Sequence, residues 1–383
     1  MSASPLKDTG TYWRRFLKLR HGKQTKEAGG SMIGRHVRAL LAILGGLALA
    51  TAADAAFGQS VEQFYQGRRV TLIVGTSPGG INDISARFVA RHLGRYIPGH
   101  PTIVVENQPG AGGIAAANRL YNVFARDGSL IAKLERAVPL VAIAGDPAVN
   151  FDPLKFTWLG SLSSYAHDAY LLLLMATNPI KSVSELKEPG KSITLGGDNA
   201  ASSNFIFANI AKDILGLNIK IVGGYSGAAP MFLAMQRGEL DGQIIGYSSV
   251  RTGQRDLWAG HRFRPLLQFG RATRLADLPD VPTAHELTKD PRVLALLDFA
   301  ELQFFMALPF AAPPDIPADR AAALQTAFMK MCTDPTVLAE ADKLGIEMSP
   351  IDGTTMLNAI ARAAATPREV VERYNTLVGA SKN

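Results

Sequence analysis

The sequence holds a single cysteine, Cys332, and has no apolar run that would span a bilayer comfortably. One cysteine cannot form an internal disulfide, so we expect Cys332 to be a buried, unreactive thiol on a helix. The apolar run at 39–50 has 12 residues, whereas a membrane-spanning helix needs about 20. We therefore favour a secretion signal over a membrane anchor for this run, and we expect a soluble mature protein.

The body of the chain has almost no net charge. The formal charge of +7 comes mostly from positions 1–55, which hold nine of the 40 Lys and Arg residues and three of the 33 Asp and Glu residues. Positions 56–383 keep 31 basic and 30 acidic residues. Because a nucleic-acid partner requires a basic surface, we expect none.

Metal-binding and enzyme motifs are also missing. Beyond position 55 the histidines are His92, His100, His167, His261 and His285, and their spacing fits no zinc motif. The glycine-rich segments match neither a phosphate-binding loop nor a dinucleotide fingerprint nor a nucleophile elbow. We therefore expect no catalytic residues, no metal and no cofactor.

The first 55 residues have the organisation of an export signal. Arg35 and Arg38 precede the apolar run, and small residues follow it up to the sequence Ala53-Asp54-Ala55. This order predicts a signal peptide over 32–55, cleaved after Ala55, and hence a secreted protein. We interpret 1–31 as an upstream extension, and the start at Met1 or Met32 stays open.

The rest of the chain alternates strands with helices. The β-branched segments 69–75 and 102–106 each end in a glycine-rich loop that a helical pattern follows. Further strand patterns lie at 192–195, 220–222 and 242–245. Because parallel strands need crossover helices, this order predicts an α/β fold. A buried strand is expected around 302–312, and three packing helices at 318–332, 335–344 and 353–378.

The loops after the strands are the places where chemistry is expected. Ligands of open α/β sheets bind beyond the carboxyl ends of the strands, and a helix start offers unpaired N–H groups and a positive dipole end. The loops 76–83 and 107–113 contain no Lys or Arg. An anion there is expected to be held by main-chain amides and hydroxyl groups.

Four segments together resemble a known family. They are VTLIVGTSPGGINDISARFVA at 70–90, VVENQPGAGGIAAANRL at 104–120, YSGAAPMFLAMQRGELDG at 225–242 and LPDVPTAHEL at 278–287. Their order is similar to that of the Bug (TctC-like) family of periplasmic solute receptors of tripartite tricarboxylate transporters. The resemblance runs from about position 69 to the last helix.

The resemblance implies a two-domain periplasmic-binding-protein fold of the Venus-flytrap kind, type II-like, with the ligand cleft between the lobes. Domain one is expected to comprise 56–163 and 302–383, and domain two 164–301. The ligand would be a small organic acid, the partners would be membrane permease subunits, and the receptor would be a monomer. The residues expected to bind the ligand are Thr76, Ser77, Gly79, Gly80, Asn82, Asp83, Gly110, Ala111, Gly112, Gly113, Ser164, Ala201, Ser202, Ser203, Tyr225, Ser226 and Gly227.

Some of these roles have alternatives. Asp83 lies in the first turn of a helix and would stabilise it with or without a ligand. A turn that is rich in hydroxyl groups and glycine in the family reads Lys133-Leu134-Glu135-Arg136 here. Glu135 and Arg136 could enter ligand recognition or face solvent. The identity of the acid stays open, as do a role in presenting ligand to a sensor kinase and, less favoured, an α/β enzyme acting on a small carboxylate.

Overall fold

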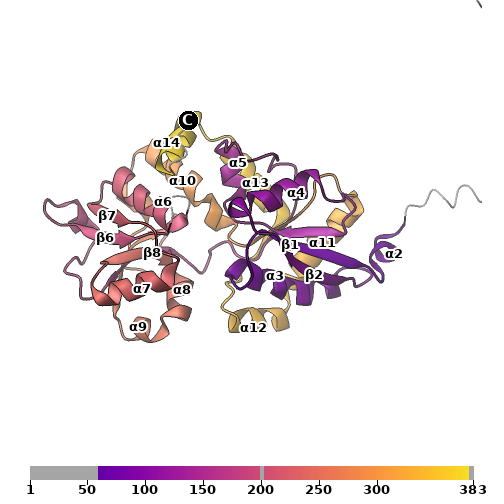
Figure 1. The fold of residues 1–383 in the computed structure, drawn as a ribbon, viewed down its shortest axis with the longest axis horizontal. Coiled ribbons are helices and arrows are strands. Elements are labelled where there is room, and N and C mark those ends of the chain that lie inside the picture. Colours follow the sequence, from indigo (N-terminus) through magenta and orange to yellow (C-terminus); the bar gives the residue numbers. More distant parts are fainter. Residues whose placement is uncertain (1–58, 199–201, 379–383) are drawn as a thin grey trace, which may run out of the picture. The chain divides into compact units, whose positions relative to one another are not determined.

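The computed structural model describes residues 59–198 and 202–378, and their strands form two sheets (Figure 1). The predicted extension 1–31, the predicted signal peptide 32–55 and Ala201 lie outside the described residues. The first sheet has the order β11-β4-β10-β3-β1-β2 and the second the order β7-β6-β8-β5-β9. The strands of the first sheet are β1 (Arg69–Val74), β2 (Thr102–Asn107), β3 (Leu130–Lys133), β4 (Thr157–Ser161), β10 (Pro309–Ala312) and β11 (Ile351–Asp352). Those of the second are β5 (Tyr170–Met175), β6 (Ile193–Gly196), β7 (Ile219–Val222), β8 (Gly242–Gly246) and β9 (Phe263–Phe269).

The helices lie on both faces of the sheets. The α-helices are α2 (Val61–Tyr65), α3 (Ile81–His92), α4 (Ile114–Asn122), α5 (Val138–Ile143), α6 (Ser203–Asn209), α7 (Ala228–Arg237), α8 (Tyr247–Gly253), α9 (Arg255–Ala259), α10 (Pro291–Phe305), α11 (Ala318–Thr333), α12 (Pro335–Lys343), α13 (Gly353–Ala364) and α14 (Arg368–Leu377). Short 3-10 helices are η1 (Leu93–Tyr96), η2 (Ala111–Gly113), η3 (Ser184–Lys187) and η5 (Ala284–Leu287), and a π-helical turn, η4 (Ile210–Ile214), extends α6.

Alternation along β1 explains why the first sheet is covered on both faces. Leu72 belongs to a core cluster with Phe88 of α3 and Phe328 of α11, whereas Ile73 belongs to a different cluster with Leu120 of α4. Neighbouring side chains on a strand point to opposite faces, so each face acquires its own helical layer. β1 pairs in parallel with β2, as the sequence predicts, and on its other side it pairs in parallel with β3.

The second sheet is also covered by helices on both faces, as two neighbouring residues of β5 show. Leu172 packs in the cluster that contains Phe207 of α6, and Leu173 packs in the cluster that contains Met231 of α7. Figure 1 shows α6 and α7 on opposite sides of the strands of this sheet. Both sheets therefore present the ends of their strands and the loops that follow them between layers of helices.

The segment 302–312 corrects one expectation from the sequence. It is not one strand, because α10 continues to Phe305 and β10 begins only at Pro309. The side chain of Asp290 accepts a hydrogen bond from the N–H of Arg292 and so caps the start of α10. Composition cannot separate a buried helix end from a buried strand, since both are continuously apolar.

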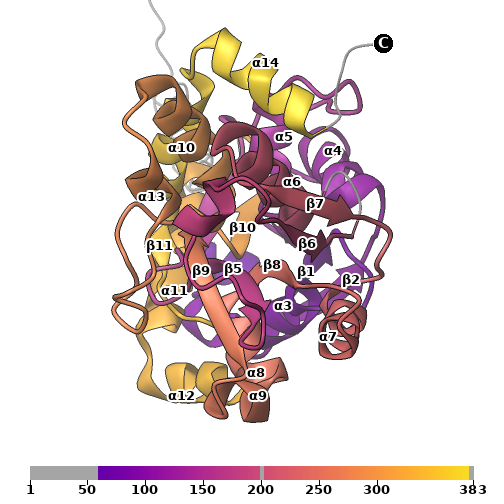
Figure 2. The same cartoon turned by 90° about the vertical axis from the view of Figure 1, so that its left-hand side faces the viewer.

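The C-terminal segment corrects another. The predicted helix at 353–378 is two helices, α13 and α14, with Pro367 immediately before α14. Proline has no N–H and does not continue a helix, but it suits a helix start. Figure 2 shows α14 beside α10, where the rings of Phe299 and Tyr374 lie 5.2 Å apart. The other two predicted helices are present as α11 and α12.

Candidate functional site

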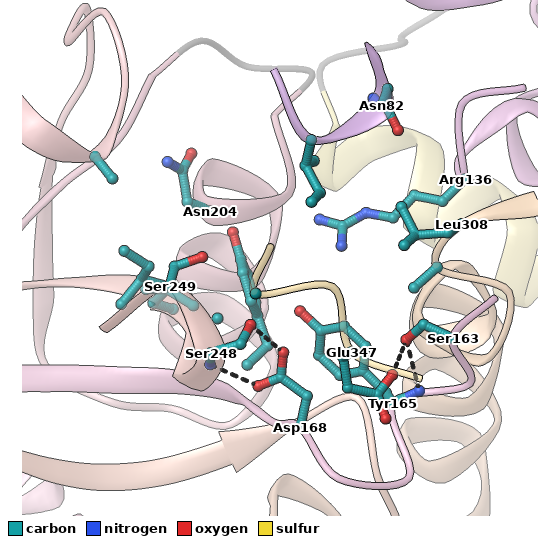
Figure 3. A pocket seen from close by; sticks show the side chains of 18 of the residues that line it. Asn82, Arg136, Ser163, Tyr165, Asp168, Asn204, Ser248, Ser249, Leu308 and Glu347 are labelled. Carbon is teal, nitrogen blue, oxygen red and sulfur yellow. Dashed lines mark hydrogen bonds between the residues drawn. The ribbon is translucent and has the colours of Figure 1, made fainter. Parts of the chain in front are cut away.

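A cavity of about 490 Å³ is lined by residues that follow strands of both sheets (Figure 3). The loops of the first sheet contribute Ile81 and Asn82 at the start of α3, and Glu135 and Arg136 after β3. The second sheet contributes residues along and after β8. The acidic side chains of the lining are Glu135, Asp168, Asp198 and Glu347, and the basic one is Arg136.

Arg136 extends into this cavity and is held by neutral groups (Figure 3). Its guanidinium donates a hydrogen bond to the Oγ of Ser203 over 3.0 Å. Its Cζ lies 4.7 Å from the ring centroid of Phe304 and 5.9 Å from that of Tyr170. Aromatic faces orient a cation without neutralising it. Arg136 thus keeps its positive charge for a ligand.

A partly buried series of hydrogen bonds fixes the wall beside Arg136. The Nζ of Lys133 donates to the Oδ1 of Asn82 over 2.6 Å and to the carbonyl oxygen of Leu134 over 2.7 Å. The amide nitrogen of Asn82 in turn donates to the carboxylate of Glu135. Burial lowers the pKa of Lys133 to about 8, although the charge of Glu135 opposes the shift. These hydrogen bonds fix the position of Asn82, and the positive charge of Lys133 offsets the negative charge of Glu135.

Two carboxylates lie on another part of the wall (Figure 3). Asp168 accepts hydrogen bonds from the main-chain N–H of Ser248 at 3.0 Å, from the hydroxyl of Ser248, and from the N–H of Ala169 at 2.8 Å. Glu347 accepts from the hydroxyl groups of Ser163 and Ser349. Burial raises the pKa of Asp168, and the charge of Glu347 raises it further.

Two buried acceptors of the lining have no hydrogen-bond partner. They are the Oε1 of Gln243, whose residue is 0% exposed, and the Oδ1 of Asp198. Buried acceptors are normally satisfied by protein, ordered water or ligand, so both positions can accept a hydrogen bond from water or from a bound molecule.

The first predicted loop meets the cavity at Asn82. Asp83 is buried behind it and accepts hydrogen bonds from the N–H of Gly79 at 2.9 Å and from the amide of Asn107 at 2.9 Å, and it pairs with Arg87 at 3.0 Å. The hydrogen bond from Arg87 lowers the pKa of Asp83 to about 2. Asp83 therefore holds the loop and the helix start together, which is the stabilising role that the sequence left open.

The other predicted residues are not part of the lining, and several of them lie next to residues that are. Gly113 packs against Glu135, Ser203 accepts the hydrogen bond from Arg136, and Gly227 precedes Ala228, which lines the cavity. The predicted residues that are described but not part of the lining are Thr76, Ser77, Gly79, Gly80, Asp83, Gly110, Ala111, Gly112, Gly113, Ser164, Ser202, Ser203, Tyr225, Ser226 and Gly227. Their contact with a ligand stays a prediction.

Several lining residues escaped sequence reasoning. Glu135 and Arg136 were left open between recognition and solvent, and both line the cavity. Glu347 lies between α12 and α13, in a tail that the sequence presents as packing helices. Gln243 had a usable signal, because it is a polar residue inside an apolar strand.

The fold belongs to a known class of binding protein. A TctC solute binding protein from Polaromonas, solved with no ligand, matches 82% of this chain and 99% of its own length at a TM-score of 0.62 and 18% identity. MatC of Rhodopseudomonas palustris, solved with bound malate, matches 81% of this chain and 99% of its own length at a TM-score of 0.52 and 22% identity. Another protein of that bacterium, solved with adipate, matches 82% of this chain and 97% of its own length at a TM-score of 0.56 and 20% identity. These similarities confirm the predicted two-lobed α/β fold of periplasmic binding proteins.

The family follows from the sequence match. The model of the tripartite tricarboxylate transporter family receptor, TctC, matches residues 86–375, and the chain belongs to this family. A UPF0065 protein of Cupriavidus necator is 28% identical over 63% of this chain and 72% of its own length. A UPF0065 protein of Bordetella pertussis is 27% identical over 80% and 88%. The predicted resemblance and the predicted receptor function are thereby confirmed.

The membrane question has a direct answer for part of the chain. Within residues 59–198 and 202–378, the structure contains no helix with the length and apolar character that a membrane crossing requires.

Proposed function

We propose that this receptor captures a small organic carboxylate in the cavity and delivers it to the permease subunits of a tripartite transporter. The cavity volume, about 490 Å³, is within the range of small-molecule sites. Two solved proteins of the same fold carry malate and adipate. The observation that carries the proposal is the guanidinium of Arg136, which lies in the cavity with a hydroxyl group and aromatic faces as its neighbours.

Arg136 and the start of α3 together form an anion site. Ile81 and Asn82 are the first two residues of this 12-residue helix, and both line the cavity. The N–H groups of a first helical turn have no intrahelical acceptor, and the aligned peptide dipoles add about half a positive charge. A carboxylate between the helix start and the guanidinium gains charge-assisted hydrogen bonds from both. Main-chain amides and a basic side chain thus both bind the carboxylate in this proposal.

Closure around the ligand follows from contacts on both sides of the cavity. We assign domain one to 56–163 and 302–383 and domain two to 164–301, so that Arg136 and Asn204 line the cavity from different domains. A ligand that touches both domains favours the closed arrangement by its differential affinity. A micromolar Kd corresponds to roughly 8 kcal/mol, which a few charge-assisted hydrogen bonds and burial of a small molecule supply.

We also assign binding rather than catalysis to this site, a monomeric state to the receptor, and the periplasm as its location after cleavage of 32–55. The family is one of solute receptors. Among the described residues, no histidine or cysteine lines the cavity, so the lining lacks the usual base for activating a serine. Loss of solute uptake in a deletion strain separates the transport role from presentation to a sensor kinase.

The test is substitution of Arg136 by glutamine, followed by calorimetric titration with C4 to C6 dicarboxylates and amino-substituted acids. We expect the Arg136→Gln variant to lose affinity by at least tenfold, because a hydrogen bond to a charged group contributes about 1.5–3 kcal/mol. Arg119→Gln is the matched control, since Arg119 also lies over a ring, 5.0 Å from the centroid of Phe124, and donates to the amide oxygen of Gln108 outside the cavity. Equal affinity of both variants and the wild type would refute the anion site.

A further inference from the structure

The charges of the cavity do not match a ligand that carries only carboxylates. Four acidic side chains and one basic side chain line it. Lys133 lies behind the wall and offsets Glu135, to which Asn82 links it through hydrogen bonds. After this compensation the lining still has more negative than positive charge. A dicarboxylate would meet Arg136 at one end and further carboxylates elsewhere.

Asp168 and Glu347 form a part of the wall in which neither carboxylate is ion-paired with a lysine or arginine of the described residues. The carboxylate of Asp168 accepts hydrogen bonds from neutral donors of Ser248 and Ala169. The charge of Arg271 acts on Asp168 from nearby, but its guanidinium donates its hydrogen bond to the main-chain carbonyl oxygen of Asp168, over 2.7 Å, and occupies none of the acceptor positions of the carboxylate. Glu347 accepts from hydroxyl groups and from the N–H of His167. An ionised carboxylate has about four acceptor positions, so both groups keep capacity for another donor.

The two carboxylates also influence each other. Glu347 lies close enough to contribute to the raised pKa of Asp168, although burial is the larger cause. Holding two negative charges side by side in a partly buried wall costs free energy unless a positive charge lies between them. Within the described residues, no lysine or arginine side chain forms an ion pair with either of them.

An independent observation points to the same type of ligand group. The Oε1 of Gln243 is buried without a partner, while the Nε2 of this amide donates to the Sδ of Met235 at 3.5 Å. The Oδ1 of Asp198 is a second buried acceptor without a partner. Both residues line the cavity. Acceptors of this kind take a donor from ordered water or from a ligand; an ammonium group supplies such donors, whereas a ligand carboxylate has none to offer at neutral pH.

We propose that the solute carries a protonated amine as well as a carboxylate, with the carboxylate at Arg136 and the ammonium group between Asp168 and Glu347. The ligand class is then an amino acid or another amino-substituted organic acid. An ammonium group has three donors, enough for both carboxylates and one further acceptor such as Gln243. The inference rests on the proposed carboxylate receptor function and narrows its ligand.

The experiment is calorimetric titration with probes that share one carbon chain: pentanoate, glutarate, 2-aminopentanoate, 5-aminopentanoate and 1,5-diaminopentane. At least one amino acid is expected to bind ten times more tightly than pentanoate and glutarate. Asp168→Asn and Glu347→Gln are each expected to remove that advantage, because each removes a carboxylate that would hold the ammonium group, and glutarate is expected to bind these variants more tightly than it binds the wild type, because a repelling negative charge is gone. Asp152→Asn is the control, because Asp152 accepts a main-chain N–H at 2.9 Å and lies outside the lining.

The outcomes separate the two levels of the proposal. If glutarate binds as tightly as the amino acids, or if the amino-acid advantage survives both substitutions, the amine inference is wrong and the carboxylate receptor stands. If no probe with a carboxylate binds, or if only the diamine binds, the carboxylate receptor itself is wrong. Glu347 is only partly buried, so Glu347→Gln keeps the test available even if Asp168→Asn impairs folding.

Discussion

Substitution of Gly113 by alanine tests how the second glycine loop supports the cavity. Gly113 has φ of +88° immediately before α4, and a Cβ at this position would lie 2.6 Å from the Cγ of Glu135 and 3.1 Å from its Cβ. Such contacts are too close, so Glu135 must move. Glu135 lines the cavity and accepts a hydrogen bond from Asn82, and Arg136 is its neighbour in the chain. The change therefore reaches the ligand site through a side chain.

The magnitude has two parts. A residue other than glycine in the left-handed region costs about 1–2 kcal/mol, and forcing a packed neighbour aside costs about 1–3 kcal/mol more. We expect the free energy of unfolding of Gly113→Ala to fall by about 2–5 kcal/mol. We also expect ligand affinity to fall by about tenfold, since a displaced Glu135 takes Asn82 with it and disturbs the hydrogen bonds beside Arg136.

Gly145→Ala is the matched control. Gly145 has a similar φ of +81°, but no atom lies within 4 Å of its added Cβ, and it is not part of the cavity lining. This variant should lose only the conformational cost and keep its affinity. Urea unfolding and calorimetry on both variants provide the measurement. The reasoning fails if the two variants lose the same stability, or if Gly113→Ala binds ligand as the wild type does.

Three further predictions concern pH, and urea unfolding at a series of pH values checks each. Burial lowers the pKa of Lys133 to about 8, so between pH 8 and 10.5 the free energy of unfolding of the wild type should rise by up to about 3 kcal/mol relative to that of Lys133→Met. The variant should also bind ligand more weakly, because it loses the hydrogen bond that Lys133 donates to Asn82. Burial raises the pKa of Glu301 to about 8, so between pH 4.5 and 8 the free energy of unfolding of the wild type should fall by up to about 5 kcal/mol relative to that of Glu301→Gln. Parallel plots of unfolding free energy against pH for the two proteins would contradict this. Asp83→Asn should cost about 2 kcal/mol at pH 7, with the difference vanishing toward pH 2, because Arg87 lowers the pKa of Asp83 to about 2.

The sequence alone determined the parts of this protein that depend on local pattern. The β-branched run at 69–75 predicts a buried parallel strand, and the glycine-rich loop after it predicts a helix start. The structure has β1 and α3 at these places. The family could also be recognised from the order of four segments along the chain, and the family model matches residues 86–375.

The boundaries of helices and strands could not be predicted where the sequence is apolar and has no periodicity. Residues 302–312 divide between α10 and β10, and only packing against neighbours decides such a division. In the C-terminal segment, Pro367 indicates a helix boundary. No sequence pattern indicates that the segment before α13 contributes Glu347 to the cavity.

Only the tertiary structure decided which side chains share the cavity. The hydrogen bond from Ser163 to Glu347 joins positions 184 residues apart, and that from Arg136 to Ser203 spans 67 residues. No local pattern encodes these meetings, because they follow from the order of strands in two sheets and the crossings between them. The sequence thus defined a receptor with loops suited to an anion, whereas the balance of acidic and basic groups around the ligand arises where distant segments meet.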